Sequence, residues 1–184
     1  MKTLIFNGSP RKNGDCAALI HELVDHLHGE VKIVSSYYDG INACIDCRYC
    51  KENVGCSIDD GMQGVYNCIE KYDNVVIASP IYFSELSGSL LGVMSRLQTY
   101  FCQRHFRNKP VDIKRKRGVL ILTGAEPGTD AKPQSTAKTL FKLMNTEDIA
   151  LVLAVDTDKT PAKCDEKALQ QAREAAMKLN EGYT

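Results

Sequence analysis

Short runs of apolar residues alternate along the chain with segments in which apolar residues recur every three or four positions. Solid apolar runs are typical of strands buried on both faces of a parallel sheet, and the longer period is typical of amphipathic helices. The pattern predicts strands at residues 2–7, 31–35, 74–79, 118–123 and 150–155, and helices at residues 15–28, 62–71, 87–106, 136–144 and 165–179. Their regular alternation predicts an α/β fold, with a single domain over residues 1–184 in which helices cover both faces of a five-stranded parallel sheet.

The loops that follow the strands are the first places to expect a functional site. In open parallel sheets, ligands bind beyond the carboxyl ends of the strands, so residues 8–14, 80–87 and 124–133 are the candidate site loops. Residues 41–60 show little periodicity and hold four cysteines, which indicates a long functional loop. At the first helix, we expect Asp15 to be the N-cap and Gly29 to provide the stop.

The charge balance gives no indication of a polyanionic partner. Lys and Arg number 23 and Asp and Glu number 23, so the formal net charge is zero. The basic run at residues 114–117 is short and is interpreted as a solvated strand entrance. We therefore expect neither nucleic acid nor a membrane surface as a partner.

The start of the chain and its cysteines bear on the expected compartment. The first residues hold too few apolar side chains for a signal peptide, and no stretch reaches the roughly 18 apolar residues that a membrane span needs. We therefore expect a cytoplasmic protein. Eight cysteines in a cytoplasmic chain argue against a disulfide framework and favour metal binding or redox chemistry.

Four cysteines give the sharpest chemical signal, with the spacing C-x2-C-x2-C-x5-C at Cys44, Cys47, Cys50 and Cys56. Such a loop can ligate zinc or an iron–sulfur cluster. Zinc ribbons usually use two well-separated pairs, so this compact spacing favours a 4Fe-4S cluster, while a thiol cluster that binds nothing remains an alternative. The other cysteines are scattered, and Cys68 and Cys102 are expected to be packing residues on helices.

The loop after the first predicted strand, residues 8–14, is built of small and polar residues and opens directly into a helix. Free N–H groups and the positive end of the helix dipole make such a loop a phosphate site. Ser9 and Asn13 add neutral donors, and Arg11 adds positive charge. The alternative is a polar turn without a ligand, because the loop matches neither the P-loop nor the G-x-G-x-x-G pattern.

Three separated motifs occur in one order, namely residues 8–14, the cysteines between 44 and 56, and the segment from Ser79 to Phe83. Together they resemble the NADPH-dependent FMN reductase branch of the flavodoxin-like proteins, and within it the iron–sulfur flavoproteins. The resemblance implies a flavodoxin-like three-layer sandwich with strand order 2-1-3-4-5. It also implies FMN as cofactor, NAD(P)H as co-substrate and a 4Fe-4S cluster on the four loop cysteines.

The resemblance further implies which residues bind FMN. The phosphate is expected on the first loop and the start of the first helix, at Ser9, Arg11, Asn13, Gly14, Asp15 and Cys16. The isoalloxazine is expected against Pro80, Ile81, Tyr82, Phe83 and Ser84, with Thr123, Gly124 and the residues up to Glu126 closing the other side. Relatives usually have Asn-Thr where this chain has Asp15-Cys16, and a thiol is a weaker hydrogen-bond donor than the Thr hydroxyl.

The function implied by the resemblance is an FMN-dependent oxidoreductase. Electrons would pass from NAD(P)H through the flavin, and through the cluster if it is present, to a small-molecule or protein acceptor. Because the cofactor supplies this chemistry, no side chain is assigned as a catalytic acid or base. Two alternatives stay open, a flavodoxin-type electron carrier without a nicotinamide step and a zinc-stabilised binding module. The resemblance suggests a homodimer or homotetramer.

Overall fold

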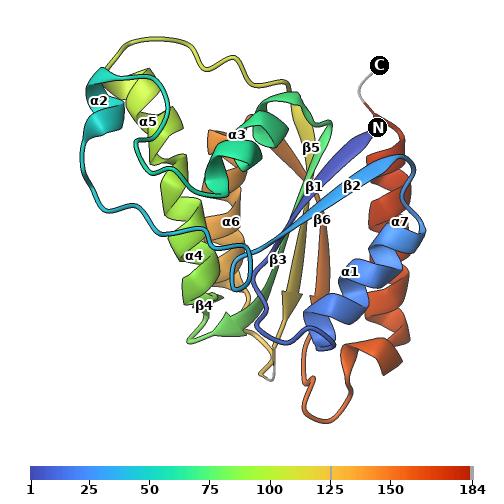
Figure 1. Ribbon diagram of the computed structural model, residues 1–184. Helices are drawn as coiled ribbons and strands as arrows, with labels where there is room; N and C mark the ends of the chain where they lie inside the picture. Colours follow the sequence, from blue (N-terminus) through green and yellow to red (C-terminus); the bar gives the residue numbers. More distant parts are fainter. Residues whose placement is uncertain (125, 183–184) are drawn as a thin grey trace.

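A parallel sheet forms the centre of the computed structural model, which describes residues 1–124 and 126–182 (Figure 1). Its strands are β1 (Lys2–Asn7), β2 (Glu30–Ser35), β3 (Asn74–Tyr82), β5 (Lys116–Thr123) and β6 (Thr146–Ala154), in the order β2-β1-β3-β5-β6. All neighbouring pairs in this order are parallel. The predicted order is confirmed, with one addition, because the two-residue strand β4 (Glu85–Leu86) pairs antiparallel with the end of β3.

Helices cover both faces of the sheet, as predicted. One face carries α1 (Asp15–Asp25) and α7 (Glu166–Asn180), and the other carries α3 (Met62–Lys71), α4 (Gly88–Met94), α5 (Gln98–His105) and α6 (Ala131–Leu143) (Figure 1). The short helix α2 (Tyr49–Glu52) lies beside α5, away from the sheet. Within the described ranges, no helix has both the length and the apolar character needed to cross a bilayer.

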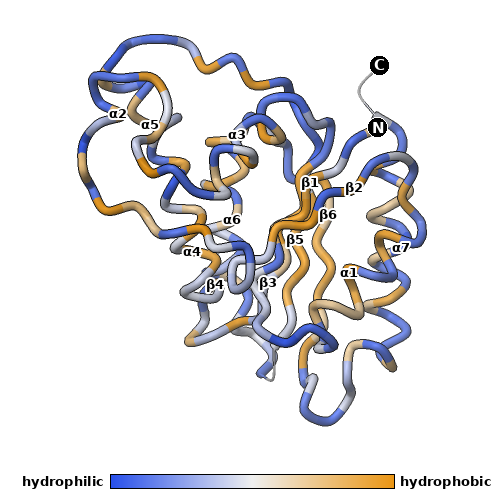
Figure 2. The backbone as a smooth tube through the Cα atoms, in the orientation of Figure 1, coloured by the Kyte–Doolittle hydropathy of each residue, from blue (hydrophilic) through white to orange (hydrophobic). Residues whose placement is uncertain are grey.

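The sheet separates two apolar cores because successive residues of a strand point to opposite faces. In β1, Ile5 packs toward α1 and α7, whereas Leu4 and Phe6 pack toward the helices of the other face. Small side chains let α7 lie close to the sheet; they are Ala168, Ala172, Ala175 and Ala176, all buried. Figure 2 shows the apolar strands in orange at the centre and hydrophilic blue on the outer turns of the helices.

The carboxyl ends of the central strands lie side by side. The pairing of β1 with β3 places Asn7 beside Ala78, and the pairing of β3 with β5 places Pro80 beside Thr123. Thr123 in turn pairs with Ala154 of β6. The loops after β1, β3 and β5 therefore leave the sheet at one edge, where open parallel sheets bind their ligands.

On the face of the sheet that carries α3, two predicted helices have other boundaries in the structure. The helix predicted over residues 87–106 is interrupted by a 3-10 turn at Ser95–Leu97, which divides it into α4 and α5. The helix predicted to begin at residue 136 begins at Ala131 instead. Pro133 then lies in the first turn, where proline removes no intrahelical hydrogen bond, so it permits this earlier start.

The prediction that Asp15 caps α1 is wrong. Gly14 occupies the N-cap position, and the Asp15 carboxylate accepts a hydrogen bond from Ala162 N at 2.9 Å, across 147 positions of the sequence. The helix also ends earlier than predicted, at Asp25, and Gly29, with φ of +98°, lies in the turn before β2. A tertiary hydrogen bond therefore replaces the local cap that the sequence indicates.

One glycine of β5, Gly118, has no room for a side chain. An added Cβ would stand 2.7 Å from Thr146 Cγ2 and 3.0 Å from Phe141 Cε1. We expect Gly118→Ala to lower the free energy of unfolding by about 1–3 kcal/mol, measured by urea denaturation. Gly88→Ala is the control, because a Cβ there meets no atom within 4 Å. Equal denaturation midpoints for Gly118→Ala and the wild type would contradict this expectation.

Candidate functional site

The loop after β1 is preorganised by its own side chains. Asn7 Oδ1 accepts a hydrogen bond from Ser9 N at 3.0 Å, and Ser9 Oγ accepts one from Arg11 N at 3.2 Å. Gly8 N donates to Ala78 O of β3 at 2.7 Å, which fixes the loop to the sheet. Short polar side chains that bond the backbone two residues on hold the turn in one conformation before any ligand arrives.

Gly14 ends this loop and leads into α1. An added Cβ would stand 2.8 Å from the Cβ of Arg11, so the loop requires glycine at this position. We call this turn, from Arg11 to Gly14, the cradle. Among the described residues, no side chain caps the helix at Gly14, and the first helical bond runs from Ala18 N to Gly14 O. The N–H groups before Ala18 therefore lack a helical partner, and the helix dipole favours an anion there.

A hollow of about 270 Å³ lies beside this helix end. Arg11 and Asn13 line it from the loop, and Lys163 lines it from the segment before α7, so two cationic side chains border it. The carboxylate of Asp15 is also on its wall, but it is engaged by Arg11 Nη2 at 3.1 Å and by Ala162 N. The pocket therefore keeps a positive rim suited to a phosphate.

Cys16 and Thr123 face each other in the core. Cys16 is 1% exposed, and its Sγ lies 3.1 Å from Thr123 Oγ1. Burial raises the pKa of Cys16 to about 12, so the thiol stays protonated at neutral pH. The backbone N–H of Cys16 is therefore the group that a ligand can contact. The buried side chain links the start of α1 to the end of β5.

β3 continues past its predicted end and forms a hairpin with β4. The turn residues Phe83 and Ser84 have φ of 53° and 56°, a region that costs residues other than glycine about 1–2 kcal/mol each. Tyr82 is 42% exposed and Phe83 is 101% exposed, so neither aromatic ring packs into the core. A solvent-exposed ring on a strained turn, at the ligand-binding edge of the sheet, points to a functional contact.

The loops after β3 and β5 lie against each other. Pro80 is buried and Ile81 is half-buried, and an added Cβ at Gly124 would stand 3.3 Å from Ile81 Cδ1. The two sets of residues expected to enclose the isoalloxazine are therefore neighbours at the sheet edge. Ala125, which falls in the predicted stretch up to Glu126, lies outside the described residues.

Two hydrogen bonds that hold the loop after β1 could not be predicted from the sequence. Tyr38 donates its hydroxyl to Pro10 O at 2.5 Å, and Lys12 Nζ lies 4.8 Å from the centre of its ring. Ser87, the N-cap of α4, donates to Gly8 O at 2.7 Å. No local pattern points to these contacts, because the hydrogen-bond partners lie 28 and 79 positions apart in the sequence.

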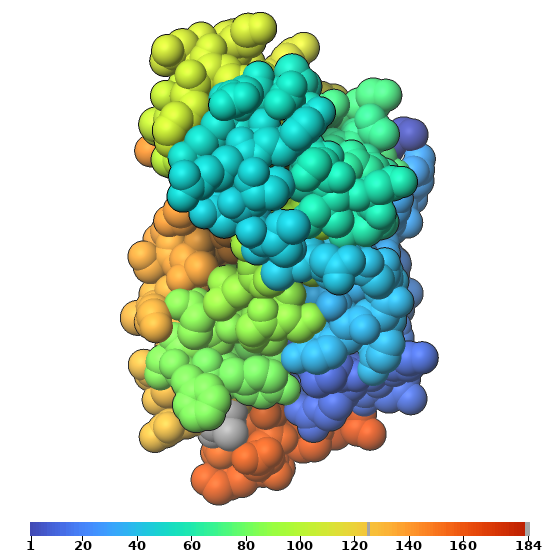
Figure 3. All heavy atoms as spheres, turned by 60° about the vertical axis from the view of Figure 1, so that its left-hand side comes forward, coloured from blue at the N-terminus to red at the C-terminus, as the bar shows by residue number. Residues whose placement is uncertain are grey.

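The cysteine loop, residues 41–60, is held at both ends by Arg96 and lies on the outer face of the molecule (Figure 3, cyan). Arg96 Nη1 donates to Asn42 O at 2.9 Å and to Asp60 Oδ2 at 2.7 Å, and Nη2 donates to Ile58 O at 3.2 Å. Arg96 is 1% exposed and the Asp60 side chain is 7% exposed. A buried ion pair therefore closes the loop.

The Asp60 carboxylate stays ionised despite its burial. Burial alone would raise its pKa, but hydrogen bonds from Arg96, Asn42 N and Met62 N outweigh burial and place the pKa below its usual value. Burial likewise opposes the charge of Arg96, and Asp60 reverses that effect and raises the guanidinium pKa. Removing one partner of such a pair leaves the other charge buried and unpaired, which is strongly destabilising.

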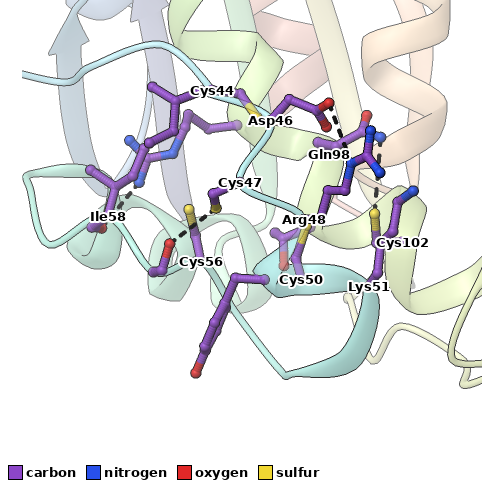
Figure 4. Close-up of a pocket in the computed structure, with 15 residues that line it drawn as sticks. Cys44, Asp46, Cys47, Arg48, Cys50, Lys51, Cys56, Ile58, Gln98 and Cys102 are labelled. Carbon is purple, nitrogen blue, oxygen red and sulfur yellow. Dashed lines mark hydrogen bonds and ion pairs between the residues drawn. The ribbon is translucent and has the colours of Figure 1, made fainter.

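Five cysteines line the pocket beneath this loop (Figure 4). Four are the predicted ligands, Cys44, Cys47, Cys50 and Cys56, and the fifth is Cys102 of α5. In the part of the chain that the structure describes, no three His, Cys, Asp or Glu side chains converge closely enough to hold a metal ion. The loop thus brings the predicted cysteines to one pocket, although the thiols do not converge.

The donor set fits a thiolate-bound metal group. Cys47 Sγ lies 3.2 Å from Ser57 Oγ, and hydrogen bonds from Ser57 and the backbone of Tyr49 lower the pKa of Cys47, which favours a thiolate ligand. Arg96 lines the same pocket, and no described residue accepts a hydrogen bond from its buried Nε. A buried N–H without an acceptor is costly, and the positive charge of Arg96 favours an anionic occupant of the pocket that it lines.

The chain is similar in sequence to known flavoproteins. The family described as NADPH-dependent FMN reductase matches residues 1–160. An iron–sulfur flavoprotein of Methanocaldococcus jannaschii is 30% identical in an alignment of 112 residues that covers 59% of this chain and 58% of that protein. An iron–sulfur flavoprotein of Archaeoglobus fulgidus is 26% identical in an alignment of 187 residues, gaps included, that covers 100% of this chain and 80% of that protein. The matched region thus spans less than two thirds of the M. jannaschii relative.

Solved structures share the fold. The NAD(P)H:quinone oxidoreductase from Methanothermobacter marburgensis has a TM-score of 0.76 at 15% identity, covering 100% of this chain and 98% of that chain. An FMN-dependent NADH-azoreductase from Bacillus anthracis, solved in complex with FMN, has a TM-score of 0.66 at 15% identity, covering 97% and 99%. These likenesses confirm the predicted flavodoxin-like architecture.

Asp60→Asn removes the counter-charge of Arg96 but keeps the side chain's shape. We expect the free energy of unfolding at neutral pH to fall by about 3–5 kcal/mol, because a buried guanidinium loses its partner. Since the folded pKa of Asp60 is lowered, the wild-type ion pair stabilises above the usual pKa of about 4 and is lost as pH falls through the folded value. Urea denaturation at neutral and acidic pH measures both effects.

Lys159→Gln is the control for this variant. It breaks an ion pair with Asp156 whose side chains are 80% and 42% exposed, so the free energy should change by less than about 1 kcal/mol. Trypsin should also cut after Arg48 or Lys51 faster in Asp60→Asn than in the wild type. Wild-type stability and wild-type acid sensitivity in Asp60→Asn would refute the role of the ion pair.

Proposed function

The chain belongs to the NADPH-dependent FMN reductase family, and from this premise we propose that it transfers electrons from NAD(P)H, through FMN and a 4Fe-4S cluster, to a small-molecule or protein acceptor. The observation that carries the flavin part is the loop that closes at Gly14, at the carboxyl edge of the sheet. Beside it lie the first N–H groups of α1, which find no backbone acceptor among the described residues. The observation that supports the cluster is the cysteine pocket lined by Arg96, whose buried Nε finds no acceptor among the described residues.

FMN, when bound, accepts a hydride from a reduced nicotinamide and releases electrons to a second substrate. The task of the chain is to bind and orient it. We propose that the first N–H groups of α1 and the Ser9 hydroxyl donate to the phosphate, while Arg11 and Asn13 add charge and a further donor. Asp15 does not repel the phosphate strongly, because Arg11 and Ala162 N already engage its carboxylate.

The isoalloxazine is proposed to lie along the sheet edge between two walls. One wall is the segment from Pro80 to Ser84, whose exposed Tyr82 and Phe83 rings are available to pack on an aromatic ligand. The other wall is Thr123 and Gly124, which the strand register holds beside Pro80. The hairpin is at the surface, so a nicotinamide and an acceptor can reach the ring from solvent.

We assign the 4Fe-4S cluster to Cys44, Cys47, Cys50 and Cys56. Such a cluster, when bound, handles one electron at a time, which complements the two-electron chemistry of a nicotinamide. Arg96 lines the pocket and supplies a fixed positive charge there, which favours a negatively charged occupant. The printed names of the M. jannaschii and A. fulgidus relatives, iron–sulfur flavoproteins, support this assignment.

A cytoplasmic homodimer or homotetramer completes the proposal. A reducing compartment keeps the loop thiols free of disulfides. Large apolar side chains are exposed on the cysteine loop, on the hairpin and at the end of α5, namely Ile45, Tyr49, Val54, Phe83 and Phe106. A second copy of the chain that covered some of these side chains would remove them from water.

Protein purified anaerobically tests the proposed function. We expect flavin absorbance at about 450 nm that NADPH or NADH bleaches, and a shoulder at about 400 nm with about four irons per chain. Gly14→Ala should lose FMN because the added Cβ closes the cradle. Gly64→Ala should keep it, since a Cβ there meets only Lys32 Nζ, at 4.0 Å.

Each contrary result selects one alternative. A flavin that neither nicotinamide bleaches would identify an electron carrier that is reduced by a protein partner. Flavin bands without iron would leave an FMN reductase with a free thiol cluster. A colourless protein that contains zinc would identify the binding module and refute the redox function.

The variant Phe83→Gly distinguishes the effect of the strained turn on stability from the proposed contact of the Phe83 ring with FMN. Glycine relieves the positive φ but adds freedom to the unfolded chain, so the free energy of unfolding should stay equal or rise by up to about 1 kcal/mol. Loss of the aromatic contact should weaken FMN binding about three- to tenfold, measured by quenching of flavin fluorescence. Phe106→Ala, an exposed ring on another element, should leave the affinity unchanged. Unchanged affinity in Phe83→Gly would rule out the contact.

A further inference from the structure

The pocket contains one more thiol than a 4Fe-4S cluster needs. Cys102 belongs to α5, not to the cysteine loop, and it is 1% exposed. It nevertheless lines the same pocket as the four loop cysteines (Figure 4). Gln98, one helical turn earlier, donates a long hydrogen bond from Nε2 to Cys102 Sγ at 3.9 Å.

Cys102 is a neighbour of Cys50. The short helix α2, which carries Cys50, packs on α5, and Lys51 Nζ lies 4.5 Å from the centre of the Phe106 ring just beyond α5. The two thiols line the same pocket, and a side-chain hydrogen bond joins them. A metal bound to Cys50 would therefore lie close to a second thiol that comes from a rigid helix.

A separate observation points to an anionic occupant of this pocket. Arg96 is almost fully buried, its Nη atoms are used by the ends of the cysteine loop, and among the described residues its Nε has no acceptor. The guanidinium is also close enough to Cys56 for the two to influence each other's charge. Cys56 therefore lies beside a cation and the Tyr66 hydroxyl, whereas Cys102 lies beside Cys50.

We propose that Cys102 is a fifth ligand of the 4Fe-4S cluster, able to take the iron that Cys56 would otherwise hold. The inference rests on the proposed function, because it concerns the same pocket. With the cluster bound, Cys102 Sγ would hold the iron in place of Cys56 Sγ. Cys102 would give up its thiol proton and Cys56 would take one up, so no electron would be gained or lost.

Four forms of the protein test the exchange. They are the wild type, Cys56→Ser, Cys102→Ser and the double variant, each loaded anaerobically with ferrous iron, ferric iron and sulfide. We expect about four irons per chain and absorbance at about 400 nm in the wild type and in both single variants. The double variant, with three pocket thiols left, should lose at least one iron per chain and change its electron paramagnetic resonance spectrum. Bound FMN and circular dichroism report whether each variant folds.

Cys68 provides a matched control, because it is a buried cysteine of α3 that does not line the pocket. Cys56→Ser combined with Cys68→Ser should hold as much iron as Cys56→Ser alone. If Cys56→Ser alone loses as much iron as the double variant, Cys102 is only a packing residue and the inference is wrong. If Cys102→Ser alone loses the cluster, Cys102 is an obligatory ligand and the exchange is wrong. A wild type that takes up no iron refutes the cluster itself.

Discussion

The buried guanidinium of Arg96 determines how the cysteine loop sits on the α/β frame. Taking such a group out of water costs several kcal/mol, which only well-placed partners can offset. Arg96 meets the Asp60 carboxylate and the carbonyls of Asn42 and Ile58, which belong to opposite ends of the loop. A planar guanidinium can bond acceptors that diverge in this way, whereas the compact ammonium of lysine cannot bridge them equally. Closure of the loop therefore depends on a residue outside it.

The helix before Arg96 links the two candidate sites. At its start, Ser87 donates to Gly8 O in the loop after β1, and just past its end Ser95 Oγ accepts a hydrogen bond from Cys44 N at 2.9 Å. At about 1.5 Å per residue, the stretch from Ser87 to Arg96 spans about 13 Å. The distance between the proposed flavin site and the cysteine pocket is thus set by one short helical segment. The 3-10 turn at Ser95–Leu97 contains Ser95 and Arg96, the two residues whose side chains bond the cysteine loop.

The sequence predicts the sheet and its covering helices because the apolar pattern that indicates each strand or helix lies within its own residues. β1 and α3 run over the predicted residues 2–7 and 62–71. The errors arise where distant residues decide the outcome. Asp15 has the local signature of a cap, but its carboxylate bonds Ala162 N. The sequence gives no sign that Arg96 closes a loop 36 to 54 positions away, or that Cys102 shares a pocket with the cysteine motif.

The departure from the relatives' Asn-Thr pair has a physical explanation in the same contacts. The Cys16 thiol is neutral and bonded to Thr123 in the core, and the Asp15 charge is balanced by Arg11 and a backbone N–H. Neither side chain then needs to contact the proposed phosphate. Recognition by backbone N–H groups depends on the conformation of the helix end and not on which side chains follow it. Asp15 and Cys16 can therefore differ from the relatives at little cost, whereas Gly14 cannot, because its missing Cβ is what lets the loop close on itself.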